Sequence, residues 1–152
     1  MVRSKAYGFD LTLQDFAELP PLIPSELLGR GVFSEKRARK ASTRGIIAHN
    51  EFLESIDRDN LSVDRLGFAP DLEMAEIADR NAAGRRQTFF GWAVVTVQQA
   101  SEMERRVEPA PLLDNRYHAL IVLNLPTGVE RRDVAREHAL NLAKHATYQP
   151  RP

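Results

Sequence analysis

The sequence predicts an α+β domain built around a small mixed or antiparallel sheet. The two most apolar stretches, residues 89–97 and 117–125, are rich in β-branched and aromatic residues, which favour strands. Neither stretch alternates strictly between apolar and polar positions, so both strands are expected to be covered on both faces. Trp92, on the first of them, is therefore expected to be buried. Residues 130–147 follow as a predicted helix.

Residues 61–66 and 71–83 add a strand and a helix before that unit. The first stretch alternates apolar and polar residues, as a half-exposed strand does, and Pro70 follows it. Asp71 is a suitable N-cap for the helix over 71–83. The predicted order is β-α-β-β-α, and the helices 71–83 and 130–147 are expected to pack together on one face of the sheet.

Residues 1–33 are predicted to form an irregular N-terminal arm packed on the domain. Pro20, Pro21 and Pro24 prevent a continuous helix, while the apolar residues around them are untypical of a disordered tail. Residues 34–152 are expected to form a single α+β domain, because a chain of 152 residues suits one domain.

Composition argues for a cytoplasmic protein. The chain has no cysteine, which excludes disulfides, a thiol nucleophile and a cysteine metal site, and fits a reducing compartment. Acidic residues interrupt any apolar core of a signal peptide near Met1. No apolar run approaches the roughly 20 residues of a membrane helix, so no membrane partner is expected.

No cofactor or metal site is expected. Residues 57–59 begin like a calcium loop, but Ser62 and Phe68 stand where that loop needs glycine and glutamate. Residues 29–31 begin like a dinucleotide-binding loop, but Ser34 occupies the third glycine position and no strong strand precedes it.

A basic segment is the main candidate for a contact surface. Residues 30–44 carry a local charge of +5, and residues 45–79 carry −7. Residues 34–41 are expected to form a short helix with Ser34 as N-cap, and charges cover most of its circumference. If the acidic stretch folds back, the charges neutralise each other. If not, the basic side is free to bind phosphates. The candidate nucleic-acid-binding residues are Lys36, Arg37, Arg39, Lys40 and Arg44.

Three histidines form a second candidate site. His138 and His145 fall along one edge of the apolar face of the last predicted helix, and His118 lies on a strand that this helix is expected to cover. Convergence of the three would suit general acid–base chemistry on a phosphodiester. Histidines at the edge of a core that bond to neighbouring backbone are the structural alternative.

The sequence leaves three functions open. The preferred interpretation is a small, non-enzymatic binding or accessory protein that contacts nucleic acid or a protein through residues 36–44. The first alternative is a small phosphodiester hydrolase, similar in chemistry to a ribonuclease, with His118 and His138 as acid and base. The second is a structural subunit that docks through its N-terminal arm. The oligomeric state is not predicted.

Overall fold

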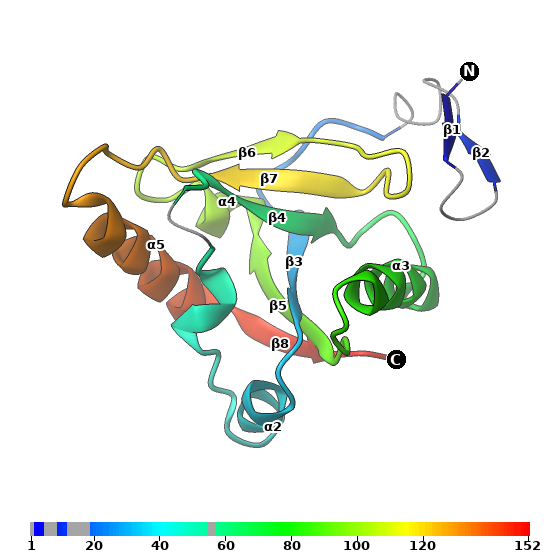
Figure 1. Ribbon diagram of the computed structural model, residues 1–152, viewed down its shortest axis with the longest axis horizontal. Helices are drawn as coiled ribbons and strands as arrows, with labels where there is room; N and C mark the ends of the chain where they lie inside the picture. The colour runs from blue at the N-terminus through cyan, green and yellow to red at the C-terminus, as the bar shows by residue number, and fades with distance from the viewer. Residues whose placement is uncertain (1, 5–8, 12–18, 55–56) are drawn as a thin grey trace.

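The computed structural model describes residues 2–4, 9–11, 19–54 and 57–152 and shows a six-stranded sheet with helices around it (Figure 1). All paired strands run antiparallel, in the order β6-β7-β4-β3-β5-β8. The strands are β3 (Leu27–Val32), β4 (Asn60–Arg65), β5 (Gly91–Thr96), β6 (Arg106–Pro109), β7 (His118–Val122) and β8 (Thr147–Pro150). Two further strands, β1 (Val2–Ser4) and β2 (Phe9–Leu11), form a separate two-stranded antiparallel sheet. The expected α+β class with an antiparallel sheet is confirmed.

The helices begin and end at local sequence signals. They are α2 (Glu35–Arg44), the 3-10 helix η1 (His49–Phe52), α3 (Asp71–Gly84), α4 (Val97–Ala100) and α5 (Arg131–His145). Ser34 caps α2 by accepting a hydrogen bond from the Arg37 backbone N–H, and Gly45 ends it with a φ of 65°. No helix in the described part of the chain is long and apolar enough to cross a membrane.

Helices cover both faces of the sheet, so the expectation that α3 and α5 pack on one face is wrong. Side chains alternate along β5: Ala93 and Val95 join a core with α5, α2 and η1, whereas Trp92 and Val94 join a separate core with α3. Both faces of this strand are apolar, and each needs its own cover. Figure 1 shows α3 and α5 on opposite sides of the central strands.

The expected irregular arm contains a central strand. β3 lies within residues 1–33, pairs with both β4 and β5, and buries Leu28 and Val32. The expected boundary is therefore wrong for these residues. Most of residues 1–18 lie outside the described part of the chain, and the expectation of a docking arm there stays a prediction.

The Trp92 ring explains why β3 has a glycine at position 29 instead of a β-branched residue. A Cβ at this position would lie 2.7 Å from Cδ1 of Trp92 and 2.8 Å from Cδ1 of Leu66. The indole ring therefore lies directly against the β3 backbone, which only glycine permits. Trp92 is fully buried, as expected.

Candidate functional site

The basic segment forms the outer side of α2. Ala38 and Ala41 face the core, whereas Lys36, Lys40 and Arg44 are exposed. A surface groove of about 320 Å³ runs between α2 and the loop that follows it. Its lining consists of Lys36, Arg37, Lys40, Ile46, Ala48 and Asn50.

The acidic stretch folds back on only part of the basic segment. Arg37 Nε lies 2.6 Å from Oε1 of Glu51, whose side chain is buried. Burial raises the pKa of the Glu51 carboxyl, while Arg37 beside it acts in the opposite direction. Arg39 pairs along the helix with Glu35, at 3.2 Å. Arg37 therefore has a structural partner.

Three cations of α2 remain without an acidic partner among the residues the structure describes: Lys36, Lys40 and Arg44. We call these three residues the α2 cation row. They lie at every fourth position, so they follow one side of the helix with a rise of about 6 Å between neighbours. The row is the part of the predicted basic surface that is free for a partner.

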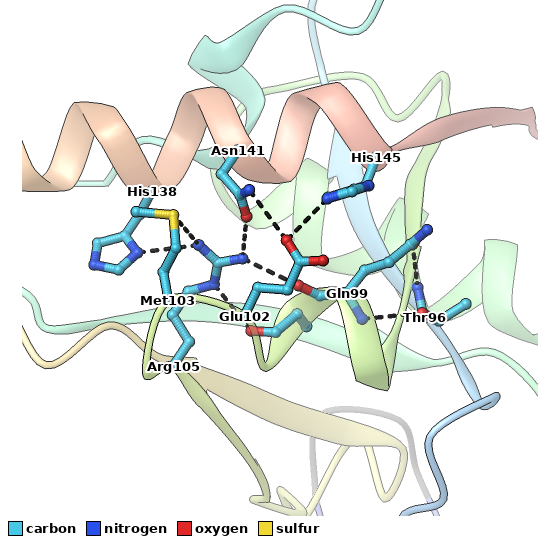
Figure 2. A network of polar contacts seen from close by, with 9 residues as sticks. Thr96, Gln99, Glu102, Met103, Arg105, His138, Asn141 and His145 are labelled. Atoms are coloured by element: carbon cyan, nitrogen blue, oxygen red, sulfur yellow. Dashed lines mark hydrogen bonds and ion pairs between the residues drawn. The ribbon is translucent and has the colours of Figure 1, made fainter.

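The three candidate histidines do not converge. Ala119 and Ile121 of β7 point into the core beneath α5, so the alternation along the strand places His118 on the opposite face. His138 and His145 lie on α5 and face the loop after α4 (Figure 2). A pairing of His118 with His138 as acid and base is therefore wrong.

Arg105 is the centre of the polar network that contains His138 and His145 (Figure 2). Each of its five N–H groups has a partner. The acceptors are Ala100 O, Gln99 O, Met103 Sδ, Asn141 Oδ1 and His138 Nδ1. Burial lowers the pKa of the Arg105 guanidinium to about 10. The network ties the carboxyl end of α4 to α5, and its donors are occupied, which indicates a structural role.

The same network fixes the two histidines of α5. Arg105 Nη1 donates to His138 Nδ1 over 3.0 Å, so the imidazole is a neutral acceptor there. Burial, and then the charge of Arg105, lower the pKa of His138. His145 Nε2 lies 2.9 Å from Oε2 of Glu102, which also accepts from Asn141. Those two hydrogen bonds are the main reasons that the pKa of Glu102 is lowered.

Acidification should weaken the fold through His138. Its native pKa lies below the ordinary 6.5, so the unfolded chain takes up a proton first as the pH falls. The contribution of neutral His138 to the free energy of unfolding is complete above pH 6.5. It is lost as the pH falls from 6.5 through the native pKa. In His138→Asn, whose side-chain oxygen lies near the position of Nδ1 and still accepts from Arg105, this part of the loss should disappear. Urea unfolding at about pH 7.5 and about pH 5 measures it. Equal pH sensitivity of the variant and the parent protein would contradict the assignment.

His118 instead shares a cavity of about 80 Å³ between the sheet and α3 with Asp64. The two residues are register partners on β7 and β4, which places their side chains beside each other on one face. His118 Nδ1 donates to Ala110 O over 2.7 Å. Asn115 Nδ2 donates to Asp64 Oδ1, also over 2.7 Å. Arg85 lies at the edge of the cavity.

Sequence reasoning missed Asp64 and Asn115 as site residues. Asp64 occupies one of the polar positions of a strand that alternates apolar and polar residues, and its neighbour on β7 is known only from the register. Within the described ranges, no group of three or more histidine or acidic side chains is arranged to hold a metal ion.

Comparison with known proteins adds no functional assignment. No protein-family model, curated protein or solved structure matches the chain. Function is therefore inferred from the geometry of the α2 cation row and of the Asp64–His118 cavity.

Proposed function

We propose that the protein binds nucleic acid through the α2 cation row. The observation that supports this proposal is that the folded acidic stretch takes up Arg37 and leaves Lys36, Lys40 and Arg44 without an acidic partner among the described residues. Like charges held this close on one helix repel one another, and an anionic partner relieves that repulsion. Contact with phosphates also releases counterions, which drives binding.

The spacing of the row favours a polymer with regular charges. Neighbouring cations rise by about 6 Å along the helix, so successive phosphates of one strand meet successive side chains. The adjoining groove adds exposed Ile46, which gives a base or a sugar an apolar surface. Contacts of this kind carry no base-specific hydrogen bonds, so binding is expected to depend little on sequence.

Replacing the row with alanine should weaken binding and its salt dependence. Each lost contact with a single strand lowers the slope of log affinity against log salt by about 0.7, so the triple variant should lose about two units of slope. The variant is Lys36→Ala/Lys40→Ala/Arg44→Ala. Fluorescence anisotropy with labelled single-stranded RNA and DNA of mixed sequence, at low and moderate salt, measures both quantities. Arg37 is kept, because its loss would leave Glu51 buried and unpaired.

A second triple variant controls for net charge. Arg132→Ala/Arg136→Ala/Lys144→Ala also removes three exposed cations from one helix, here α5. It should bind as the parent protein does. Equal weakening by the two variants would show only a general charge effect. Absence of binding at the lowest salt would reject nucleic acid and favour an acidic protein partner.

A further inference from the structure

The Asp64–His118 cavity places two titratable groups on a rigid base. Both residues lie on paired strands in the interior of the sheet, and α3 covers the same face. The hydrogen-bonded ladder fixes the Cα atoms of both residues, so each side chain moves only by changing its rotamer. Sites on strands hold reacting groups more precisely than sites on loops.

Neighbouring groups orient both side chains. His118 gives its Nδ1 proton to the backbone of Ala110, so Nε2 is the nitrogen that accepts a proton. Asn115 is buried, and its own oxygen accepts from the Tyr117 backbone N–H, which aims the amide nitrogen at Asp64. Oδ1 of Asp64 is thereby engaged, and Oδ2 has no partner among the described residues. Asn115 and Ala110 are positioning groups.

The cavity has the size and charge for one phosphodiester group. Its volume of about 80 Å³ is roughly half that of a cavity that holds a benzene ring. It therefore holds a compact group while the remainder of the ligand lies outside. Arg85 is exposed at its edge and has no acidic partner among the described residues, so it is available to a phosphate oxygen.

We propose that this cavity is a general acid–base site that cleaves RNA, with His118 as the base and Asp64 as the acid. The choice of RNA rests on the nucleic-acid binding proposed above. RNA carries its own nucleophile, the ribose 2′-hydroxyl, beside each phosphate. The protein then has to supply only a proton acceptor, a proton donor and a charge for the phosphate, which are the groups present here.

The reaction needs no co-reactant. His118 Nε2 takes the proton of the 2′-hydroxyl, and the 2′-oxygen forms a bond to phosphorus. The bond from phosphorus to the 5′-oxygen breaks, and the Asp64 carboxyl gives its proton to that oxygen. The products are a 2′,3′-cyclic phosphate and a 5′-hydroxyl end. Burial raises the pKa of Asp64, which favours the protonated form that the second step requires. Solvent then restores both protonation states.

A structural role for the pair predicts a different result from a catalytic one. Asp64→Asn keeps the oxygen that accepts from Asn115 and removes a carboxylate whose charged form burial disfavours. We therefore expect this variant to melt at or above the temperature of the parent protein while losing activity. Stability given up for function is the pattern of an active site. If Asp64 were purely structural, replacing it with asparagine would instead lower the melting temperature of the protein.

Cleavage of labelled RNA tests the proposal. The parent protein should cleave single-stranded RNA of mixed sequence, leave the matching DNA intact, and yield cyclic phosphate ends. Asp64→Asn and His118→Asn should each lower the rate by about a hundredfold or more. His49→Asn, a histidine change on η1 away from the cavity, serves as the matched control and should leave the rate unchanged. Preparing all four proteins alike exposes any contaminating nuclease.

The outcomes separate this proposal from nucleic-acid binding. RNA that is bound but not cleaved by the parent protein would reject the acid–base site and leave the binding proposal intact. Cleavage at equal rates by all four proteins would also reject it. Cleavage that depends on Asp64 and His118, with binding unaffected by loss of the α2 cation row, would uphold this site and reject the row as the binding surface.

Discussion

Replacing Glu26 with alanine should lower the free energy of unfolding by about 3–5 kcal/mol. Glu26 and Arg65 form a bidentate ion pair, with Nε to Oε2 at 2.6 Å and Nη2 to Oε1 at 2.8 Å. Both side chains are buried, at 5% and 2% exposure. Removing the carboxylate leaves the guanidinium in the interior without its counter-charge, and Pro20 O, its other acceptor, is neutral. Urea unfolding followed by circular dichroism measures the loss.

A double variant separates the cost of leaving Arg65 unpaired from the net contribution of the ion pair to the free energy of unfolding. Glu26→Met/Arg65→Met removes both charges and keeps apolar volume, so it should be much less destabilised than Glu26→Ala. If Glu26→Ala unfolds within about 1 kcal/mol of the parent protein, Arg65 has found water or another partner. In that case, the buried ion pair does not hold the segment before β3 against β4.

The sequence predicted elements whose signals are local. Ser34 and Gly45 mark the ends of α2. The strands β5 and β7 lie within the stretches expected to be extended, and β4 begins one residue before its expected stretch. β3 was missed because Gly29 and Gly31 resemble a turn. The Trp92 ring across the sheet is the reason for Gly29, whereas a Cβ at Gly31 would meet the ring of Phe33. β6 and β8 are short strands that end in proline, and they are recognised only by their partners. Both faces of the central strands are apolar, so the sequence does not indicate which face each helix covers, and tertiary packing decides it.

The candidate sites show the same division. The sequence located the basic segment, but only the fold shows that Glu51 takes Arg37 and leaves the α2 cation row. His118 was noted as a titratable residue, whereas its neighbour Asp64 belongs to another strand and depends on register. His138 lies on the helix face expected for it, yet its partner Arg105 comes from a loop that carries no periodic pattern. Long-range pairing decides which polar residues are structural.

Replacing Trp92 with alanine should also cost about 3–5 kcal/mol, because the cavity left beneath α3 cannot collapse fully. The side chain is completely buried, and its ring meets that of Phe89 edge-on, with centroids 4.7 Å apart. Nε1 has no hydrogen-bond partner among the described residues, so the contribution of the residue comes from packing. Trp92→Phe keeps an aromatic ring and should cost clearly less. Since Trp92 is the only tryptophan, iodide should fail to quench the native fluorescence of the parent protein.

Gly29 provides the sharper test of this packing. In the parent protein, Gly29→Ala places a methyl group against Trp92 and Leu66 and should destabilise by about 1–3 kcal/mol through overpacking. In the Trp92→Ala background the ring is gone, so the same methyl group enters space that the cavity has opened. The two changes should therefore couple favourably, with the double variant more stable than the sum of the single losses predicts. Additive losses would mean that the Trp92 ring does not pack against the β3 backbone. Close packing of that ring would then not explain the glycine at position 29.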